Sequence, residues 1–137
     1  MTLHAYTDGA SRGNPGESGI GVIVKNDKGE PILRLAAYIG RATNNLAEYT
    51  ALLTLLKRVR GIDCQRLIVH SDSELMVRQL NGEYRIKNPE IGKYYKEIQD
   101  ILRTIPFAIE IKHVSRETNY EADQLANEGI ESRVRLE

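Results

Sequence analysis

The sequence has a single cysteine, no tryptophan, one phenylalanine and no excess of charge of either sign. The lone Cys64 excludes a disulfide framework and any metal site built from several cysteines. The 19 basic residues balance 19 acidic ones, which argues against attachment to nucleic acid through a bulk positive field but leaves local contacts open. No apolar run approaches the roughly 18 residues that cross a membrane. The first residues also lack the basic start and apolar core of a signal peptide. We therefore expect a cytoplasmic protein with no membrane partner.

The composition that remains is that of one folded domain. The chain has 137 residues, of which 41% are hydrophobic, and this balance excludes intrinsic disorder as the main state. A chain of this length buries about two thirds of its unfolded surface, so it needs no cross-links for stability. We expect a single domain over residues 1–137 that acts as a monomer, with no obligate protein partner.

Hydrophobic periodicity predicts a mixed α/β chain. The segment 9–19 contains four glycines and Pro15, which predicts a long irregular loop. Thr43, Asn44 or Asn45 is expected to cap the first helix, and the pair Thr118 and Glu121 fits a capping box for the last one. The predicted strands are 3–8, 19–27, 31–39, 66–72 and 107–114, and the predicted helices are 44–60, 73–82, 89–103 and one that begins near residue 119.

The connections between these elements predict where a ligand would bind. The short gap between the second and third strands makes them an antiparallel hairpin. The helix over 44–60 connects to the strand over 66–72 by a crossover, which places two strands parallel. If the strands 3–8 and 66–72 are neighbours, their carboxyl ends lie side by side, at the edge of an α/β sheet where ligands usually bind.

Four acidic residues stand at the positions that this arrangement brings together. Asp8 and Asp72 end the two parallel strands, while Glu48 and Asp123 border the apolar stripes of two helices. Carboxylates at close range repel one another and raise each other's pKa, and a divalent cation removes the repulsion. Ligands that are all oxygen favour Mg²⁺ or Mn²⁺, and two such ions can assist phosphodiester cleavage. Taken singly, each acid also fits a turn, a helix cap, a helix dipole or a solvated surface.

Four sequence motifs in register resemble type 1 ribonuclease H, in particular its shorter prokaryotic branch. They are YTDGASRGNPG, TNNLAEYTAL, VHSDSELMVRQL and HVSRETNYEADQLAN, and together they span about residues 3–130. The resemblance implies an α/β fold with a mixed five-stranded sheet, in which three antiparallel strands come first, flanked by helices. It also implies an enzyme that cuts the RNA strand of RNA/DNA hybrids internally, leaving 5′-phosphate and 3′-hydroxyl ends.

The resemblance also assigns roles to individual residues. It implies that Asp8, Glu48 and Asp72 are catalytic metal ligands and that Asp123 is the fourth acid, for two Mg²⁺ or Mn²⁺ ions in all. Residues that match substrate contacts are the backbone of Gly9, near the RNA 2′-hydroxyls, then Asn14, Asn44 and Asn45 for the hybrid and Thr43 for a phosphate of the DNA strand. A 2′-hydroxyl is the feature by which a protein distinguishes RNA from DNA.

The chain departs from the family pattern at two places. Many members carry a mobile histidine before the last acid, whereas here His113 falls inside a predicted strand and Arg116 is the candidate in the loop. Arginine stays protonated, so it would stabilise phosphate charge, and the alternative is a solvated loop residue.

Longer members have a basic helix, but residues 78–103 carry only six basic and four acidic side chains. Tyr84, Arg85 and Lys87 could touch the DNA strand, although most of this segment fits a solvated helix face, and we expect modest affinity for the hybrid that falls with salt.

Other functions stay open at this stage. One is a binding module on the same fold that has lost catalysis, although all four acids are present. Another is a related nuclease acting on DNA ends or junctions, since fold does not fix function. Duplex RNA is a possible further substrate. The chain could also be a structural domain of a larger assembly, against which we weigh the absence of a linker-like segment.

Overall fold

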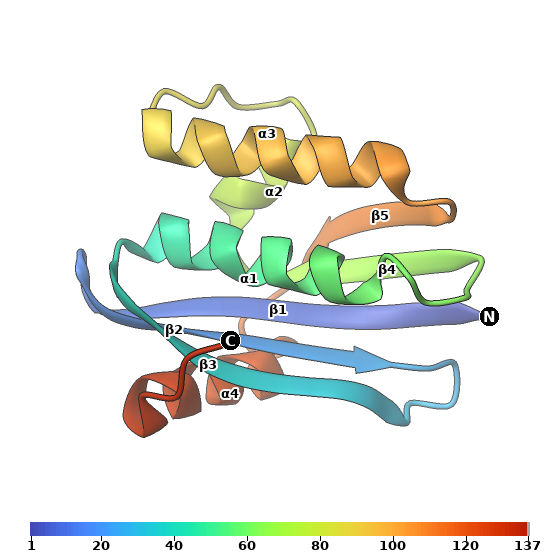
Figure 1. The fold of residues 1–137 in the computed structure, drawn as a ribbon, viewed down its shortest axis with the longest axis horizontal. Helices are drawn as coiled ribbons and strands as arrows, with labels where there is room; N and C mark the ends of the chain where they lie inside the picture. Colours follow the sequence, from blue (N-terminus) through green and yellow to red (C-terminus); the bar gives the residue numbers. More distant parts are fainter. Residues whose placement is uncertain (137) are drawn as a thin grey trace.

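The computed structural model describes residues 1–136, which form one sheet with four helices (Figure 1). Within that range, no helix is both long and apolar enough to cross a membrane. In chain order the elements are β1 (Thr2–Gly13), β2 (Gly16–Lys25), β3 (Pro31–Ala42), α1 (Asn44–Val59), β4 (Arg66–Ser71), α2 (Glu74–Leu80), α3 (Pro89–Thr104), β5 (Ala108–His113) and α4 (Tyr120–Ser132).

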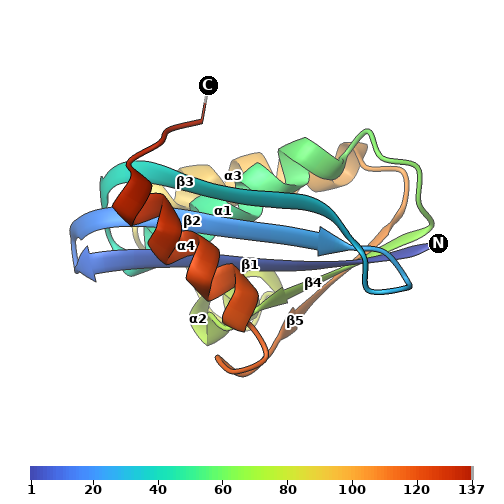
Figure 2. The same ribbon diagram turned by 90° about the horizontal axis from the view of Figure 1, so that it is seen from below.

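The five strands form one mixed sheet in the order β3-β2-β1-β4-β5. Strand β2 pairs antiparallel with both β1 and β3, whereas β4 pairs parallel with β1 and with β5. Helices α1 and α3 lie on one side of the sheet and α4 lies on the other (Figures 1 and 2). This arrangement confirms the predicted fold class, including the antiparallel first three strands and the parallel neighbours β1 and β4.

Helix α1 lies at the centre of the core because it packs against the sheet on one side and α3 on the other. Its buried stripe includes Leu52, Leu55 and Leu56, which meet Leu3 and Ala5 of β1 in one hydrophobic cluster. The Thr43 hydroxyl accepts a hydrogen bond from the backbone N–H of Leu46 at 3.1 Å, so Thr43 is the cap among the three candidates. This capped, buried helix holds its first two turns firmly against the middle of β1.

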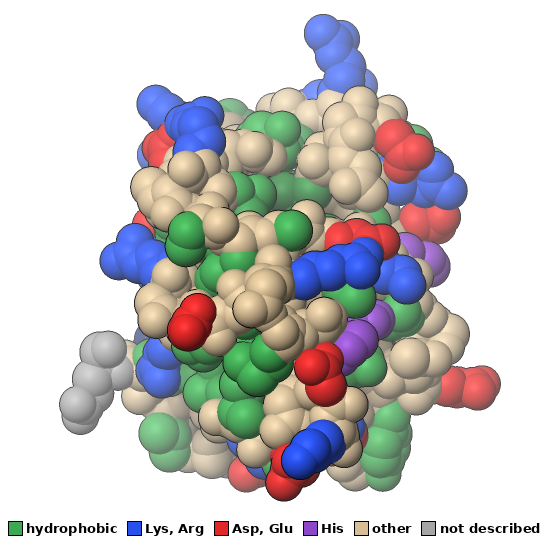
Figure 3. All heavy atoms as spheres, turned by 90° about the vertical axis from the view of Figure 1, so that its right-hand side faces the viewer, with side chains coloured by type: hydrophobic (Ala, Val, Ile, Leu, Met, Phe, Trp, Pro, Cys, Tyr) green, Lys and Arg blue, Asp and Glu red, His purple; other side chains and the backbone are tan. Residues whose placement is uncertain are grey.

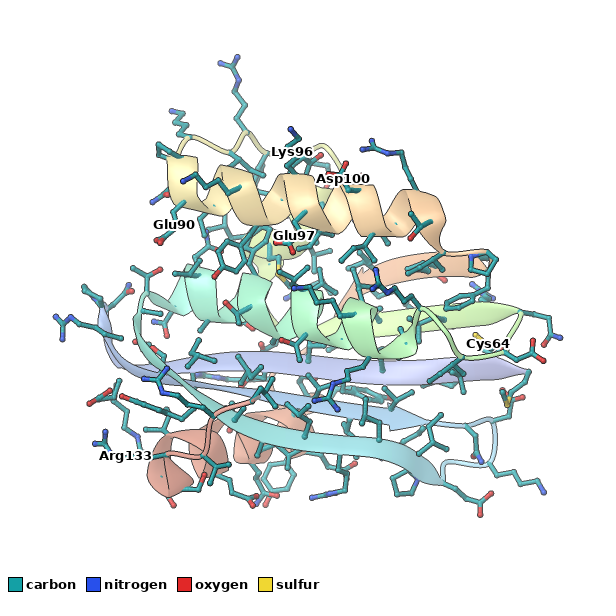
Figure 4. The ribbon with its side chains drawn as sticks, in the orientation of Figure 1. Cys64, Glu90, Lys96, Glu97, Asp100 and Arg133 are labelled. Carbon is teal, nitrogen blue, oxygen red and sulfur yellow. The ribbon has the colours of Figure 1, made fainter. Side chains whose placement is uncertain are left out.

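The outer surface of α3 is the solvated face that its charges indicate. Glu90, Lys96 and Asp100 are exposed on it (Figure 4). In the adjoining segment, Arg78 pairs with Glu74 at 3.0 Å. At the end of the sheet where β1 begins, basic and acidic side chains are interspersed (Figure 3). The surface charges therefore alternate in sign over these regions, consistent with the balanced composition.

The expectation of an irregular loop over residues 9–19 is wrong. Strand β1 continues to Gly13, β2 begins at Gly16, and the two strands pair over this whole stretch. The glycines have a different purpose, since a Cβ at Gly9 would lie 2.3 Å from the carbonyl carbon of Ala47 and one at Gly19 would lie 2.4 Å from the carbonyl oxygen of Ala126. They allow helices on both faces to approach the sheet closely. Gly13, with φ of 108°, and Gly16, where a Cβ would lie 2.1 Å from the carbonyl oxygen of Arg12, serve the turn itself.

The predicted capping box at the start of α4 is also wrong. Asn119 stands at the N-cap and its side chain makes no capping hydrogen bond. The Thr118 hydroxyl pairs with the Ser115 hydroxyl at 2.9 Å, and Glu121 pairs with Lys25 at 2.5 Å. Thr118 and Glu121, which the local pattern assigned to the cap, are therefore bonded to residues outside the helix instead.

Candidate active site

The sheet brings the acids of β1 and β4 to neighbouring positions. Thr7 of β1 is paired with Ser71 of β4, so Asp8 and Asp72, one residue further along each strand, lie side by side. Glu48, in the second turn of α1, points back toward them. One carboxylate oxygen from each of Asp8, Glu48 and Asp72 lies within 4.8 Å of the others, and this group could hold a metal ion.

Asp123, in the first turn of α4, joins the same site from the other face of the sheet. It lines a cavity of about 660 Å³ together with Asp8, Glu48 and Asp72. The sequence prediction that four acids converge at this edge therefore matches their positions in the fold. Gly9, Asn44 and Arg116 line the cavity as well, so seven of the ten residues predicted for the site share it.

Close contact between β1 and α1 fixes the position of Glu48. Gly9 has no side chain to keep the two elements apart, and its backbone N–H donates to Glu48 Oε1 at 2.8 Å. The Gly9 N–H is thus used inside the protein, where it holds the Glu48 carboxylate. The consequence is that Glu48, although buried, has a defined carboxylate orientation before any ligand arrives.

Burial and mutual repulsion hold protons on this cluster when no cation is present. The pKa of Asp8 is raised, first by burial and then by the negative charges of Glu48 and Asp72. The pKa of Glu48 is also raised, again by burial first and then by Asp72, against the opposing influence of the Gly9 N–H and Arg116. A buried set of oxygen donors that resists ionisation is suited to bind a divalent metal ion.

Arg116 and His113 also line the cavity. Arg116 is 86% exposed, and its Nε lies 4.0 Å from Asp72 Oδ2. His113 lies in β5, as the sequence predicted, but it is the last residue of that strand and it also lines the cavity. The sequence interpretation had set His113 aside because of its place in a strand, but a residue at the carboxyl end of a strand reaches the same edge as the acids.

The remaining predicted contact residues surround the start of α1. Asn14 Oδ1, in the turn between β1 and β2, accepts from the backbone N–H of Asn44 at 3.1 Å. Thr43 caps the helix, and Asn45 Oδ1 is buried without a hydrogen-bond partner among the described residues. Asn14, Thr43 and Asn45 are not among the residues that line the cavity of the acids. They form a second polar region beside it, joined to it through Asn44.

Sequence analysis missed four polar residues at this edge, one of which is Ser115, which lines the cavity. Ser11 lines the cavity, as does Asn127, whose Nδ2 donates to the carbonyl oxygen of Asp123 at 3.0 Å. Asn119 is fully buried beside them. Asn119, Asp123 and Asn127 are spaced by four residues, which places them on one face of α4. That spacing was available from the sequence and would have indicated the two asparagines.

Comparisons with known proteins agree with this geometry. The sequence profile of the family described as "Reverse transcriptase-like" matches residues 6–129. The chain is 36% identical over 129 residues to a curated protein named Ribonuclease HI from Halobacterium salinarum, covering 94% of this chain and 64% of the relative. The chain thus spans somewhat less than two thirds of the length of that relative.

Solved structures give the same result. The crystal structure of RNase H1 from Halobacterium salinarum superposes with a TM-score of 0.90 at 36% identity, covering 96% of this chain and 99% of that one. LC11-RNase H1, solved in complex with an RNA/DNA hybrid, superposes with a TM-score of 0.88 at 40% identity, covering 95% and 97% of the two chains. The motifs, the sheet order, the cluster of acids and these similarities lead to one conclusion: the chain belongs to the type 1 ribonuclease H family.

Proposed function

We propose that this chain is a ribonuclease H, a metal-dependent endonuclease that hydrolyses the RNA strand of RNA/DNA hybrids and leaves 5′-phosphate and 3′-hydroxyl ends. The observation that carries the proposal is the cluster of Asp8, Glu48 and Asp72, whose oxygens lie within 4.8 Å of one another, with Asp123 in the same cavity. Similarity to a relative named Ribonuclease HI and to an RNase H1 solved with a hybrid supports the substrate class.

Asp8, Glu48, Asp72 and Asp123 are proposed to hold two Mg²⁺ or Mn²⁺ ions. When bound, such ions activate water and stabilise the leaving oxygen in phosphodiester hydrolysis. Asp8 and Glu48 have raised pKa values, so the carboxylates release protons as cations bind. Glu48 accepts the Gly9 N–H, which keeps its carboxylate oriented through that change of charge.

The other residues of the edge are proposed to hold the substrate. Arg116 can swing its exposed guanidinium toward a phosphate oxygen, where its fork of N–H donors forms charge-assisted hydrogen bonds. Asn14, Asn44 and Asn45 offer amide groups to the hybrid, and Thr43 offers a hydroxyl to a DNA phosphate. The backbone of Gly9, which lines the cavity together with the acids, can contact an RNA 2′-hydroxyl, the group that distinguishes RNA from DNA. We further propose that residues 1–137 act as one domain and as a monomer.

A panel of end-labelled substrates tests the proposal. The same RNA sequence is presented as a hybrid with DNA, as a single strand and as duplex RNA, beside duplex DNA of that sequence. We expect internal cuts in the RNA of the hybrid, with little dependence on sequence. Equal cutting of duplex DNA would instead support a related DNA nuclease, and cutting of duplex RNA would add a second substrate. Folded protein that binds the hybrid without cutting it would support a binding module.

A further inference from the structure

Asn119 is a buried junction between three segments that supply residues to the cavity. Its side-chain Nδ2 donates to the carbonyl oxygen of Thr7 at 2.8 Å, directly before Asp8 on β1. Its backbone carbonyl accepts from the N–H of Asp123 at 3.1 Å, and its own N–H donates to the carbonyl of Arg116 at 3.2 Å. One residue with no exposed surface therefore connects the strand of Asp8, the helix of Asp123 and the loop of Arg116.

Asn119 stands at the N-cap of α4, but its side chain does not cap the helix. An asparagine at an N-cap ordinarily accepts a hydrogen bond from a backbone N–H of the first turn, but Asn119 makes no such bond. Its Oδ1, like the hydroxyl of Thr7, is buried without a hydrogen-bond partner among residues 1–136. Unpaired buried polar atoms are unfavourable for folding, and they gather where a functional site constrains the structure. Stability of α4 alone does not explain this arrangement.

The other contacts at the start of α4 go to other strands, among them β3, whose Arg34 pairs with Glu121 at 3.7 Å. Glu121 pairs with Lys25 of β2, and the carbonyl of Ala122 lies so close to Gly21 of β2 that a Cβ there would come within 2.2 Å of it. These contacts hold the helix on the sheet near β2 and β3. The Asn119 side chain instead bonds to β1, the strand that carries Asp8. It therefore fixes the distance between α4 and the acids of the central strands.

We infer that Asn119 is a positioning residue, which sets the place of Asp123 relative to Asp8 and thereby the affinity of the site for a divalent ion that these two residues would hold. This inference deepens the proposed function and rests on it. Residues that orient the ligands of a metal typically change metal affinity or activity tenfold to hundredfold when they are replaced. Asn119 orients Asp123 through the main chain, by way of the hydrogen bond between its carbonyl and the Asp123 N–H.

The substitution Asn119→Ser separates positioning from stability. Serine is among the best N-cap residues, so α4 keeps or gains stability, but its shorter side chain cannot reach the Thr7 carbonyl. The full chain is titrated with Mn²⁺ by calorimetry, and its melting temperature is followed against Mn²⁺ concentration. We expect the weaker metal-binding step to lose about tenfold or more in affinity. In hybrid cleavage, kcat falls at limiting Mg²⁺ and recovers as Mg²⁺ is raised, while hybrid affinity measured in EDTA changes less than about twofold.

The matched control is Leu125→Ala, which removes a buried side chain from the same helix without touching the junction. It should lower the melting temperature and leave the Mn²⁺ titration unchanged. The inference is overturned if Asn119→Ser binds Mn²⁺ like the wild type, if Leu125→Ala weakens Mn²⁺ binding equally, or if neither Asn119→Ser nor Asn119→Ala folds cooperatively, since Asn119 would then be a requirement of folding. Because Mn²⁺ binding is measured without substrate, wild type that binds Mn²⁺ but cuts no hybrid would contradict the proposed function alone.

Discussion

Replacing Asp8 by asparagine should stabilise the protein when no divalent cation is present. Asp8 is buried at 4% exposure, and its carboxyl group faces two other acids within 4.8 Å. Asparagine has nearly the same shape but carries no charge and takes up no proton. The substitution therefore removes one source of repulsion from the cluster while it preserves the packing between β1 and α1.

The magnitude follows from two competing free energies. At an effective dielectric constant of about 20, two charges separated by 4.8 Å repel by about 3.5 kcal/mol. An ionised Asp8 would therefore face that repulsion from Asp72, and from Glu48 whenever Glu48 is ionised, in addition to the cost of burying its own charge. Keeping Asp8 protonated at pH 7, about three units above its usual pKa, costs about 4 kcal/mol. Protonation is the less unfavourable state, which agrees with the raised pKa of Asp8. Structural relaxation and water entry make the real cost of protonating Asp8 smaller than this value. We therefore expect Asp8→Asn to raise the free energy of unfolding by about 2 kcal/mol at pH 7.

The sign of the pH dependence is fixed by the direction of the shift. The pKa of Asp8 is raised in the folded, metal-free protein, whereas in the unfolded chain it stays near its ordinary value of about 4. Above about pH 4 the unfolded chain loses this proton first, so the free energy of unfolding of the wild type falls as pH rises toward 8. Asp8→Asn does not lose stability in this way. The difference in free energy of unfolding between the variant and the wild type should therefore be absent at pH 4 and grow with pH.

The assay is urea unfolding in EDTA at pH 4, 6 and 8, followed by circular dichroism. At pH 7 the gain corresponds to a rise in melting temperature of about 6–10 °C. In Mg²⁺ the order should reverse, because only the wild type is stabilised by bound cation. The same substitution at the exposed Asp63 is the control and should change little. A metal-free Asp8→Asn that is no more stable than wild type at pH 8, or equally more stable at pH 4, would refute this account of the cluster.

Two further predictions concern single contacts of the site. Arg116→Ala should slow hybrid cleavage about tenfold by removing a cation beside the phosphate, with the melting temperature nearly unchanged because the side chain is 86% exposed; a lower melting temperature with unchanged turnover would assign Arg116 a structural role. Gly9→Ala should lower the free energy of unfolding by about 2 kcal/mol or more, since its Cβ would meet the backbone of Ala47 at 2.3 Å. Gly92→Ala, in the interior of α3 with open space around the added Cβ, is its control and should stabilise the protein by about 0.5–1 kcal/mol in the same urea titration.

The sequence predicted the fold well where local signals and global packing agree. The stripe of Leu52, Leu55 and Leu56 marks a buried helix, and the crossover from α1 to β4 requires the parallel pair of β1 and β4. The position of Asp8 beside Asp72 follows from that pair. These features depend on periodicity and chain direction, which are properties of the sequence itself.

The errors came from residues whose partners are distant in the chain. Gly9 and Gly19 resemble loop residues, because a sequence does not show which helix will approach a strand. Thr118 and Glu121 match a capping box, yet the fold offers Glu121 a lysine from β2 instead. The spacing of Asn119 from Asp123 indicates a shared helix face, but the sequence does not show that Asn119 is buried, since its partner is a backbone carbonyl of Thr7, 112 residues away. Such contacts depend on the complete tertiary structure and are hard to infer from a local pattern.

The most direct test of the central claim compares wild type with Asp72→Asn in the cleavage of an end-labelled RNA/DNA hybrid, with Mg²⁺, Mn²⁺ or EDTA. The account predicts internal cuts by the wild type in Mg²⁺ or Mn²⁺, none in EDTA, and a loss of far more than tenfold for Asp72→Asn, because one metal ligand contributes more than about 1.4 kcal/mol. Circular dichroism is the check that the variant is folded. Cleavage that persists in EDTA, or an Asp72→Asn rate within about tenfold of wild type, would contradict the claim that these carboxylates hold the catalytic cations.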